Sequence, residues 1–572
     1  MSESPTRCCD LVLKGGITSG ILYPPAIARL AEGYVFAGLG GTSAGAICAA
    51  FAAAAELRRR RTGRATGYRL MERYVESLAA DGALAGLFRP DGATCDLFDF
   101  VHRASRLTEA GRLERLGLKL GMLRRVLFHR RTLRPWIDNG FGLATGMAND
   151  RPPSDRRPPM TRWLTGALDA VADLDREVLT FGHLWRAPLP PGALGAAMRD
   201  LEGHSIRLQM VTTCLTFRRP YLLPFRAPRF AFDPEAWSRL FPARVIDHLI
   251  AASDRVAGGE ALRRDGKLPL AVGADLPVVV AVRLSLALPG LFSLVPLWAV
   301  DEEDARRPLR KVWFSDGGIT SNLPIHTFDV LFPRWPTLAI SLQATEDDGT
   351  PARAHVGDDL LDMVESLGEE RRELWHGFED RTTVAGRALD FLDAIFRSAQ
   401  MWHDASYFRL PGFRERVIEI WLRPDEGGLN LNMSRATIED LIARGDEAGR
   451  RLRDRFIKTP ADDPLSWESH RWGRLRSSLA ALTVALRRFE QTVAHPMPGD
   501  RSILDYFGPA IPPAYDFGDP QRRHRAERAV RDLLAWVDSL ALQTPDTDLP
   551  PDFPFDDGGP TPPLRIGSRL PM

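Results

Sequence analysis

The first sixty residues alternate between short apolar runs and helical patterns, and this alternation limits the folds that the chain can adopt. Apolar runs at Cys9–Lys14 and Tyr34–Leu39 predict two strands. A glycine-bearing loop follows the first run, and helical patterns occupy Ile21–Glu32 and the alanine-rich stretch Ala44–Leu57. Because a helix separates the two strands, we expect them to pair in parallel. The sequence therefore predicts an α/β fold with a mostly parallel central sheet.

Strand patterns return after residue 205 and indicate that the same sheet continues there. They occur at Ile206–Leu215, Val278–Leu284, Lys311–Phe314, Thr337–Leu342 and Val417–Leu422. Residues 66–204 differ, because helical patterns alternate there with arginine-rich pieces; the clearest are Tyr68–Ala79, Leu97–Ser105 and Leu118–Phe128. We interpret residues 66–204 as a helical insertion, and a candidate lid, in an α/β domain formed by residues 1–65 and 205–430.

The end of the chain predicts a helical region followed by a tail. The stretch Asp358–Gln400 is mostly helical in pattern. Apolar residues step by three and four from Trp472 to Val493, and again from Ala526 to Leu540, which predicts two amphipathic helices packed as a hairpin. They belong to a C-terminal helical region at residues 431–542, and a coiled-coil seam in a homo-oligomer is the alternative. Residues 543–572 are rich in proline, glycine and aspartate, which predicts disorder.

The charge balance and the cysteines exclude several classes of protein. The net charge is +1 over 572 residues, so no overall field favours binding to nucleic acid. The five cysteines lack the spacing of a zinc site or a disulfide framework, which favours a reducing compartment. No cluster of His, Asp, Glu or Cys has metal-ligand spacing, so we expect neither a metal nor another cofactor.

No segment has the pattern of a leader or a membrane span. The N-terminus lacks the basic segment and apolar core of a secretory signal. The most apolar stretch, Leu268–Val300, is interrupted by charged residues and prolines, whereas a spanning helix needs about 20 clean apolar residues. We therefore expect this stretch to be buried core. The protein is expected to be cytoplasmic, with at most a transient, peripheral contact with a membrane surface.

Gly41-Thr42-Ser43-Ala44-Gly45 is a G-x-S-x-G motif between a predicted strand and a predicted helix. A turn of this kind holds a nucleophilic serine in a strained backbone conformation, and small flanking residues allow the chain segments to approach closely. The hydroxyl of Ser43 is then expected at the carboxyl edge of the sheet, beside a helix N-terminus that favours negative charge. The alternative is a glycine-rich turn in which Ser43 only caps the helix.

Two further segments carry groups that a serine nucleophile needs. Gly15 and Gly16 follow the first predicted strand, so their amides can face the oxyanion of a tetrahedral intermediate. Asp316 stands in FSDGG, just after another predicted strand, and therefore also at a carboxyl end. Its carboxylate can act as the base that activates the hydroxyl of Ser43. The alternatives are tight turns, or a phosphate-binding glycine loop, for which neither G-x-G-x-x-G nor a Walker lysine is present.

Three motifs, in this order, resemble those of the patatin-like phospholipases: LVLKGGITSGILYP at Leu11–Pro24, GTSAG at the elbow and SDGGITSNLP at Ser315–Pro324. The stretches Val211–Phe225 and Leu284–Val295 are similar to further segments of that family. The resemblance covers residues 8 to about 345, apart from the insertion. It implies a three-layer α/β/α fold and a lipid acyl hydrolase of phospholipase A type that works through an acyl-enzyme.

The same resemblance implies roles for individual residues. It implies a catalytic dyad of Ser43 and Asp316, without a histidine. The implied oxyanion hole consists of the amides of Gly15, Gly16 and Ile17. The positions that support these motifs are Gly41, Gly45, Gly317, Gly318 and Asn322.

The glycine loop departs from the family pattern at two positions. Ile17 stands where a third glycine is usual, and Ser19 stands where arginine or lysine is usual. Ile17 can still donate its amide but cannot cheaply adopt a glycine-only backbone conformation. The missing cation gives an oxyanion less support. A second interpretation is therefore a catalytically weak or inactive scaffold or regulatory protein that acts through its C-terminal helices.

The base and the substrate each have an alternative. His326 follows Asp316 in the chain and could complete a Ser-Asp-His triad, although its place near the start of a helix favours a surface or capping role. Phospholipid is the expected substrate because of the resemblance, and neutral glycerides and lysophospholipids are the alternatives.

Two segments of the sequence are candidates for contact with a lipid substrate or membrane. The apolar stretch Leu284–Trp298 could line a channel for acyl chains or form ordinary core. The arginine cluster at residues 58–61, with Arg64 and Arg69, could meet lipid phosphates or form a solvated helix end.

Overall fold

The computed structural model describes most of the chain, and every structural statement below concerns the described residues. These are residues 5–16, 19–79, 83–95, 97–98, 130–147, 158–175, 177–198, 203–330, 332–345, 356–365, 394–395, 398, 414–427, 430, 433–457, 463, 465–494, 497, 499, 502–508 and 519–539.

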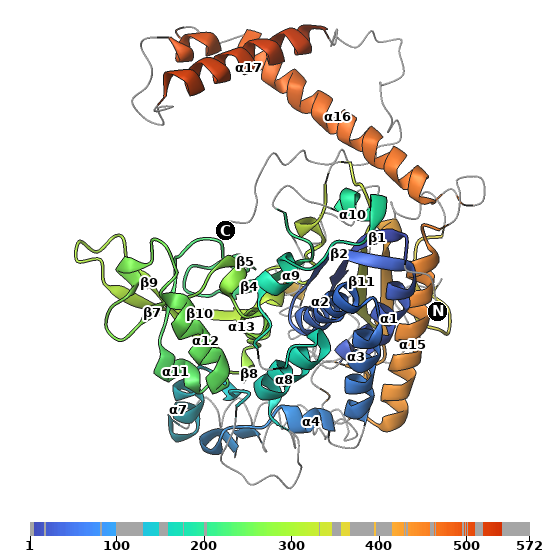
Figure 1. Ribbon diagram of the computed structural model, residues 1–572, viewed down its shortest axis with the longest axis vertical. Coiled ribbons are helices and arrows are strands. Elements are labelled where there is room, and N and C mark those ends of the chain that lie inside the picture. Colours follow the sequence, from blue (N-terminus) through green and yellow to red (C-terminus); the bar gives the residue numbers. More distant parts are fainter. Residues whose placement is uncertain are drawn as a thin grey trace, which may run out of the picture.

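A large sheet forms the centre of the protein (Figure 1). Its strand order is β12-β13-β11-β1-β2-β4-β10-β9-β6-β7, with β5 paired to β4. The central strands run parallel: β13 (Val417–Leu422), β11 (Thr337–Ala344), β1 (Arg7–Leu13), β2 (Tyr34–Gly41) and β4 (Arg207–Cys214). Antiparallel strands flank them: β5 (Arg219–Leu223), β6 (Ala231–Phe232), β7 (Leu268–Pro269), β9 (Val295–Val300), β10 (Leu309–Asp316) and β12 (Leu361–Asp362). A separate parallel pair joins β3 (Gly142–Ala144) to β8 (Gly290–Phe292).

Helices surround the sheet and bury its central strands on both faces. The longer ones in this body are α1 (Tyr23–Gly33), α2 (Ala44–Thr62), α3 (Thr66–Glu76), α7 (Arg130–Asp138), α8 (Met160–Ala172), α12 (Ala243–Ser253), α13 (Val278–Ser285) and α15 (Arg435–Asp454). The shorter ones are α4 (Ala83–Leu87), α9 (Phe181–Trp185), α10 (Gly192–Met198) and α11 (Pro234–Ser238). Every residue of β2 is buried, as expected for a parallel strand that is covered on both sides.

Alternate residues of β1 point to the two faces and show what covers each of them. Leu11 and Leu13 belong to the main hydrophobic core, together with residues of α1 and α2. Val12 points to the other face and packs in a smaller cluster with Leu323 and Phe328. The predicted α/β fold with a mostly parallel central sheet, flanked by helices, is confirmed.

One predicted strand is a helix. The run at Val278–Leu284 forms α13, which begins after Pro277 and is buried along its whole length. A short apolar run of β-branched residues is compatible with a buried strand or a buried helix, and periodicity alone does not separate the two. The other predicted strands are present. Some predicted helices lie outside the described residues: Leu118–Phe128, most of Leu97–Ser105 and most of Asp358–Gln400. The described start of Asp358–Gln400 contains a strand, β12.

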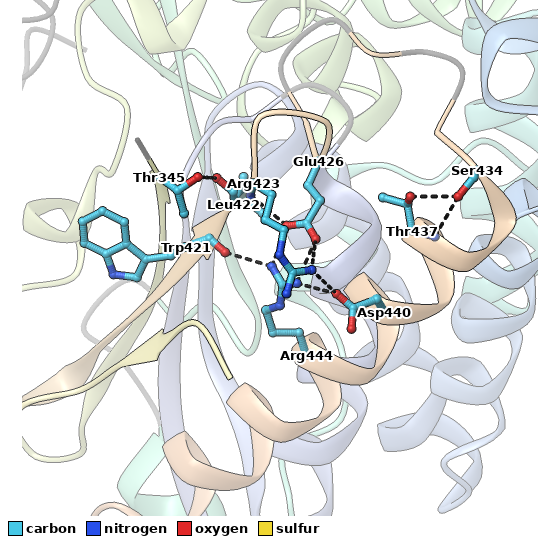
Figure 2. Close-up of polar contacts among 9 residues, drawn as sticks. All are labelled: Thr345, Trp421, Leu422, Arg423, Glu426, Ser434, Thr437, Asp440 and Arg444. Carbon is cyan, nitrogen blue, oxygen red and sulfur yellow. Dashed lines mark hydrogen bonds and ion pairs between the residues drawn. The ribbon is translucent and has the colours of Figure 1, made fainter. Parts of the chain in front are cut away.

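A polar cluster fixes the connection between β13 and α15 (Figure 2). Arg444 of α15 donates to both carboxylate oxygens of Glu426, at 2.7 and 2.9 Å, and to the carbonyl of Trp421 at 2.8 Å. Ser434 caps the start of the helix by accepting the amide of Thr437 at 3.1 Å. These contacts attach α15 to the end of a central strand.

Two glycines bring α15 against α1. A Cβ at Gly445 would lie 2.1 Å from the carbonyl oxygen of Leu22, and a Cβ at Gly449 would lie 2.6 Å from that of Ala26. α15 therefore supports the helix that follows the glycine loop. Residues of α3, α8 and α15 share the main core with the sheet. The division into an insertion at 66–204 and a helical region at 431–542 remains a prediction.

Two long C-terminal helices occupy the positions that the apolar spacing predicts. They are α16 (Trp467–Ala494) and α17 (Pro520–Ser539), and both stand off from the sheet body in Figure 1. Ion pairs hold the root of α16, because Asp329 contacts Arg474 of α16 and Arg416 beside β13, each at 2.9 Å. The predicted tail at 543–572 lies outside the described residues.

Two residues of the arginine cluster at the end of α2, Arg59 and Arg60, point into the protein. Glu56 is fully buried and pairs with Arg59 and with Nε of Arg60, the latter at 2.8 Å. Both guanidinium groups also donate to carbonyls at the start of β2, Arg59 to Tyr34 at 2.9 Å and Arg60 to Phe36 at 2.5 Å. They hold α2 to the sheet at the edge opposite the G-x-S-x-G turn. Both sequence-based alternatives, a lipid contact and a solvated helix end, are therefore wrong for these two arginines.

We expect Glu56→Gln to lower the free energy of unfolding by about 3–5 kcal/mol, because it leaves two buried guanidinium groups without a counter-charge. Burial alone raises the pKa of Glu56, but Arg59 and Arg60 outweigh it, so the pKa is lowered and the carboxylate is charged at neutral pH. Denaturant unfolding measures the change. The control is Glu439→Gln, which removes an exposed pair with Arg435 of the same length, 2.8 Å, and should change stability by less than about 1 kcal/mol. Equal effects of the two substitutions would contradict this account.

Candidate active site

Ser43 occupies a strained turn between β2 and α2. Its φ is 55° and its ψ is −126°, a combination that residues with a side chain rarely adopt and that costs about 1–3 kcal/mol. Its carbonyl accepts the amides of Ala46 at 3.0 Å and Ile47 at 3.3 Å, in the first turn of α2. Its own amide donates to Oγ of Ser285 at 3.2 Å. The surrounding hydrogen bonds therefore hold Ser43 in the strained conformation.

The elbow needs glycine on both sides of Ser43. A Cβ at Gly41 would lie 2.6 Å from the carbonyl carbon of Gly45. A Cβ at Gly45 would lie 2.3 Å from the carbonyl oxygen of Leu13, the last residue of β1. Both distances are too short for real atoms, so a side chain at either position would force the start of α2 away from the sheet.

Asp316 is the last residue of β10 and is held by backbone contacts. Its amide donates to the carbonyl of Ala287 at 2.9 Å, and its carboxylate oxygen Oδ1 accepts the amide of Gly318 at 2.7 Å. A Cβ at Gly317 would lie 1.9 Å from the carbonyl oxygen of Val211, so the chain after Asp316 lies directly on β4. The two glycines of the FSDGG motif thus shape the turn that presents the carboxylate.

The strand register explains how Asp316 reaches the elbow. The strand β10 is antiparallel to β4 and pairs Asp316 with Thr212, so it is not one more parallel strand. The strand β4 is parallel to β2 and pairs Met210 with Gly41. Since Thr212 lies two residues beyond Met210, the end of β10 meets the sheet just past the end of β2, where the elbow turns. An antiparallel strand thus delivers its last residue to the carboxyl edge of the parallel ones.

The carboxylate of Asp316 has the environment of a weak base. Burial raises the pKa of Asp316 to about 6, while the amide of Gly318 and the hydroxyl of Ser43 lower it and so limit the shift. Among the described residues, no group lies in hydrogen-bonding geometry to the second oxygen, Oδ2, which is buried. The hydroxyl of Ser43 is therefore near enough to lower the pKa of the carboxylate, although no aligned hydrogen bond joins Ser43 to Oδ2. Such loose geometry is common in unliganded catalytic sites.

The glycine loop packs against the elbow, and the amide of its first glycine already has a hydrogen-bond partner. A Cβ at Gly15 would lie 3.3 Å from Cβ of Ser43, so the two backbones nearly touch. The amide of Gly15 donates to the carbonyl of Asn322 at 3.0 Å. The N–H group of Gly15 therefore already has a partner in the fold, and its predicted role as an oxyanion donor would require it to give up this bond. Gly16 lies half-buried next to it, and Ile17 lies outside the described residues.

Asn322 lies where three segments of the site meet. Its carbonyl accepts the amide of Gly15 and also the hydroxyl of Thr42 at 3.0 Å. Its Oδ1 would lie 2.3 Å from a Cβ at Gly15 and 2.9 Å from one at Gly318. Asn322 thus joins the glycine loop, the elbow and the turn after Asp316.

His326 lies in a short 3-10 helix (Ile325–Thr327) beyond this junction. Among the described residues, the influences on the pKa of Asp316 are burial, the amide of Gly318 and the hydroxyl of Ser43, and none of them is a histidine. The geometry around Asp316 therefore favours an aspartate that acts on Ser43 directly over the triad alternative.

Two buried hydroxyl residues of the site, Ser285 and Thr212, were not predicted from the sequence motifs. Ser285 accepts the Ser43 amide, and the hydroxyl of Thr212 lies 2.9 Å from the carbonyl oxygens of both Leu284 and Ser315, to either of which it can donate. Hydroxyl side chains in otherwise apolar buried segments are the signal that could have identified them, because a buried hydroxyl needs a partner. Several side chains of the apolar stretch Leu284–Trp298, such as Leu284, lie in the main hydrophobic core. This placement favours ordinary core over a channel for acyl chains.

The described residues contain no cluster of three His, Cys, Asp or Glu side chains that could hold a metal ion. Within the same residues, no helix is long and apolar enough to cross a membrane. All five cysteines are free thiols.

A strained serine at a strand-to-helix turn, next to a buried aspartate, defines an α/β protein with a nucleophile-elbow site. The family model for patatin-like phospholipases matches residues 11–329. A protein described as an RpoH suppressor from Rhizobium meliloti (strain 1021) is 31% identical, over an alignment that covers 96% of this chain and 97% of that protein. The chain belongs to the patatin-like phospholipase family, and at the level of that family its domain is a lipid acyl hydrolase.

We expect Gly45→Ala to destabilise the protein by about 1–3 kcal/mol, because the added methyl group overlaps the carbonyl oxygen of Leu13. The matched control is Gly166→Ala on α8, where a Cβ meets no atom within 4 Å. That control should stabilise the helix by roughly 0.5–1 kcal/mol. Thermal or denaturant unfolding of both variants checks the sign. A Gly45→Ala variant as stable as the control would show that the turn has room for a side chain.

Proposed function

We propose that the protein hydrolyses acyl esters of lipids, with Ser43 as the nucleophile and Asp316 as the base. The observation that carries the proposal is a serine at positive φ near a buried carboxylate whose Oδ2 has no hydrogen-bond partner in the described part of the chain. Ser43 and Asp316 are only 4% and 3% exposed, so bulk water competes little for the proton between them. The family supports ester hydrolysis in general, and these two side chains give the proposal its specific chemistry.

The reaction proceeds through an acyl-enzyme. Oδ2 of Asp316 takes the proton from Ser43 while Oγ attacks the ester carbonyl. The tetrahedral intermediate then collapses, the C–O bond to the alcohol breaks, and Asp316 returns the proton to the leaving oxygen. In the second half, Asp316 takes a proton from water, which attacks the acyl-serine. The fatty acid leaves and Ser43 regains its proton.

Two backbone elements can stabilise the oxyanion. The first is the start of α2, where the amides of Ala44 and Gly45 have no partner one turn earlier in the helix, and where the helix dipole favours negative charge. The second is the glycine loop, through Gly16 and, as the resemblance implies, Ile17. With Gly15 engaged elsewhere, the loop supplies fewer amides than the sequence predicted. The N-terminus of α2 therefore contributes more of the stabilisation of the oxyanion. This contribution also offsets the absence of a cation at position 19, where Ser19 stands.

Phospholipid is the proposed substrate, and the site would reach it during transient contact with a membrane surface. Wild type and Ser43→Ala incubated with phospholipid vesicles provide the test, with mass spectrometry of the released lipids. Wild type should release fatty acid and lysophospholipid in equal amounts, and Ser43→Ala should release neither. Release from triglyceride emulsions or lysophospholipid alone would redirect the proposal to those substrates.

Replacing the carboxylate should remove the base while keeping its shape. We expect Asp316→Asn to lower kcat by about 10²–10⁴-fold, because the amide cannot accept the proton of Ser43. Folding should survive, since the amide of Gly318 can still donate to the retained Oδ1. Hydrolysis of a short-chain ester measures the loss, with circular dichroism as the check on folding. A folded Asp316→Asn variant with wild-type activity would refute the dyad.

The pH dependence of Ser43 reactivity should follow the ionisation of Asp316. A base must be ionised to accept a proton, and the pKa of Asp316 is raised to about 6. We therefore expect the rate of labelling by a fluorophosphonate probe to be constant above pH 7 and to fall about tenfold per pH unit below pH 6. Labelling absent from wild type would favour the inactive scaffold. Labelling that does not change between pH 5 and 7 would exclude Asp316 as the base.

A further inference from the structure

The last residue of α13 connects the elbow to the sheet. Ser285 is fully buried, and its hydroxyl donates to the carbonyl of Val211 on β4 at 2.7 Å. A hydroxyl has one hydrogen, so Oγ presents only lone pairs to its remaining neighbours. One of these lone pairs accepts the amide of Ser43 at 3.2 Å. The two hydrogen bonds, from the amide of Ser43 to Ser285 and from Ser285 to the carbonyl of Val211, therefore have fixed donor and acceptor roles.

Within the described residues, the amide of Ser43 has no backbone hydrogen-bond partner. It follows the end of β2 and precedes the first turn of α2, so neither the strand ladder nor the helix satisfies it. A buried amide without a partner costs about 1–3 kcal/mol. The position of this amide also sets the φ of Ser43, because rotation about its N–Cα bond moves the side chain relative to the fixed peptide plane. The bond to Ser285 thus supports the conformation in which φ is 55°.

The same short segment also holds the second catalytic group. The carbonyl of Ala287 accepts the amide of Asp316 at 2.9 Å and the hydroxyl of Ser315 at 3.0 Å. Residues 285–287 therefore contact the backbone amide of Ser43 at one end and the backbone amide of Asp316 at the other. The separation of the two groups depends on this segment as well as on the strand register.

We infer that Ser285 is a positioning residue for the nucleophile, which holds the backbone of Ser43 so that its hydroxyl faces Asp316. This inference rests on the proposed function. Ser285 does not touch the reacting atoms, since its hydroxyl is used by Val211 and by the amide of Ser43. Its loss should therefore affect the chemical step and leave lipid binding unchanged. A displacement of about 1 Å in a reacting group can cost about 100-fold in rate.

The test compares Ser285→Ala with a matched control, Ser253→Ala on α12. Ser253 is also buried, donates to a backbone carbonyl at 2.7 Å and accepts an N–H group at 3.2 Å, but its partners are Ile250 and Arg263. The two variants should lose similar amounts of stability. Ser285→Ala should lower kcat for a short-chain ester and the rate of fluorophosphonate labelling roughly 10- to 100-fold. Its KM should stay within about twofold, since substrate binding is not affected. Ser253→Ala should keep wild-type kinetics.

The outcomes separate this inference from the proposed function. Wild-type rates in a folded Ser285→Ala variant, with labelling still lost in Ser43→Ala, would overturn the positioning role and leave the proposed function intact. Absence of Ser43-dependent labelling in wild type would overturn both. If Ser285→Ala does not fold, Ser285→Cys is measured in its place, because sulfur fills a similar volume but is a weak acceptor. A lowered kcat with unchanged KM in that variant supports the inference, and unchanged kinetics contradict it.

Discussion

The backbone conformation of Ser43 is the constraint on which the rest of the site depends. Its φ of 55° is unfavourable for a residue with a side chain, so the fold must supply contacts that maintain it. The first turn of α2 holds the carbonyl of Ser43, and Ser285 holds the amide. The absence of a side chain at Gly45 lets α2 start against the end of β1. The central sheet can be understood as the rigid support for this one turn.

Ser43 and Asp316 are separated by most of the family-matched region, and strand register brings them together. The strand β4 extends past the end of β2, and β10 returns along it to end at the elbow. Burial at that point raises the pKa of Asp316, and Oδ2 of its carboxylate has no hydrogen-bond partner among the residues that the structure describes. A surface carboxylate would be solvated and a weaker base. The same burial that completes the core therefore gives the proposed base its strength.

Local patterns predicted what depends on local chemistry. The alternation of strands and helices in the first sixty residues predicted the parallel core, and G-x-S-x-G between a strand and a helix predicted the turn at Ser43. The run Val278–Leu284 was predicted to be a strand but forms a helix, because a short apolar run of β-branched residues is compatible with either a buried strand or a buried helix. The hydrogen bond that engages the amide of Gly15 depends on Asn322, which is remote in the chain. Such long-range contacts, and the antiparallel direction of β10, leave no periodic signal in the sequence.

The most direct test of the account is to locate the acyl group during turnover. Wild type is mixed with a short-chain acyl ester, quenched in acid within the first turnovers and digested for peptide mass spectrometry. The account predicts the mass of the acyl group on the peptide that contains Ser43, formed about 10²–10⁴-fold more slowly when the carboxylate of Asp316 is absent. An acyl group on a different residue, or equal rates with and without that carboxylate, would contradict the central claim that these two side chains act together.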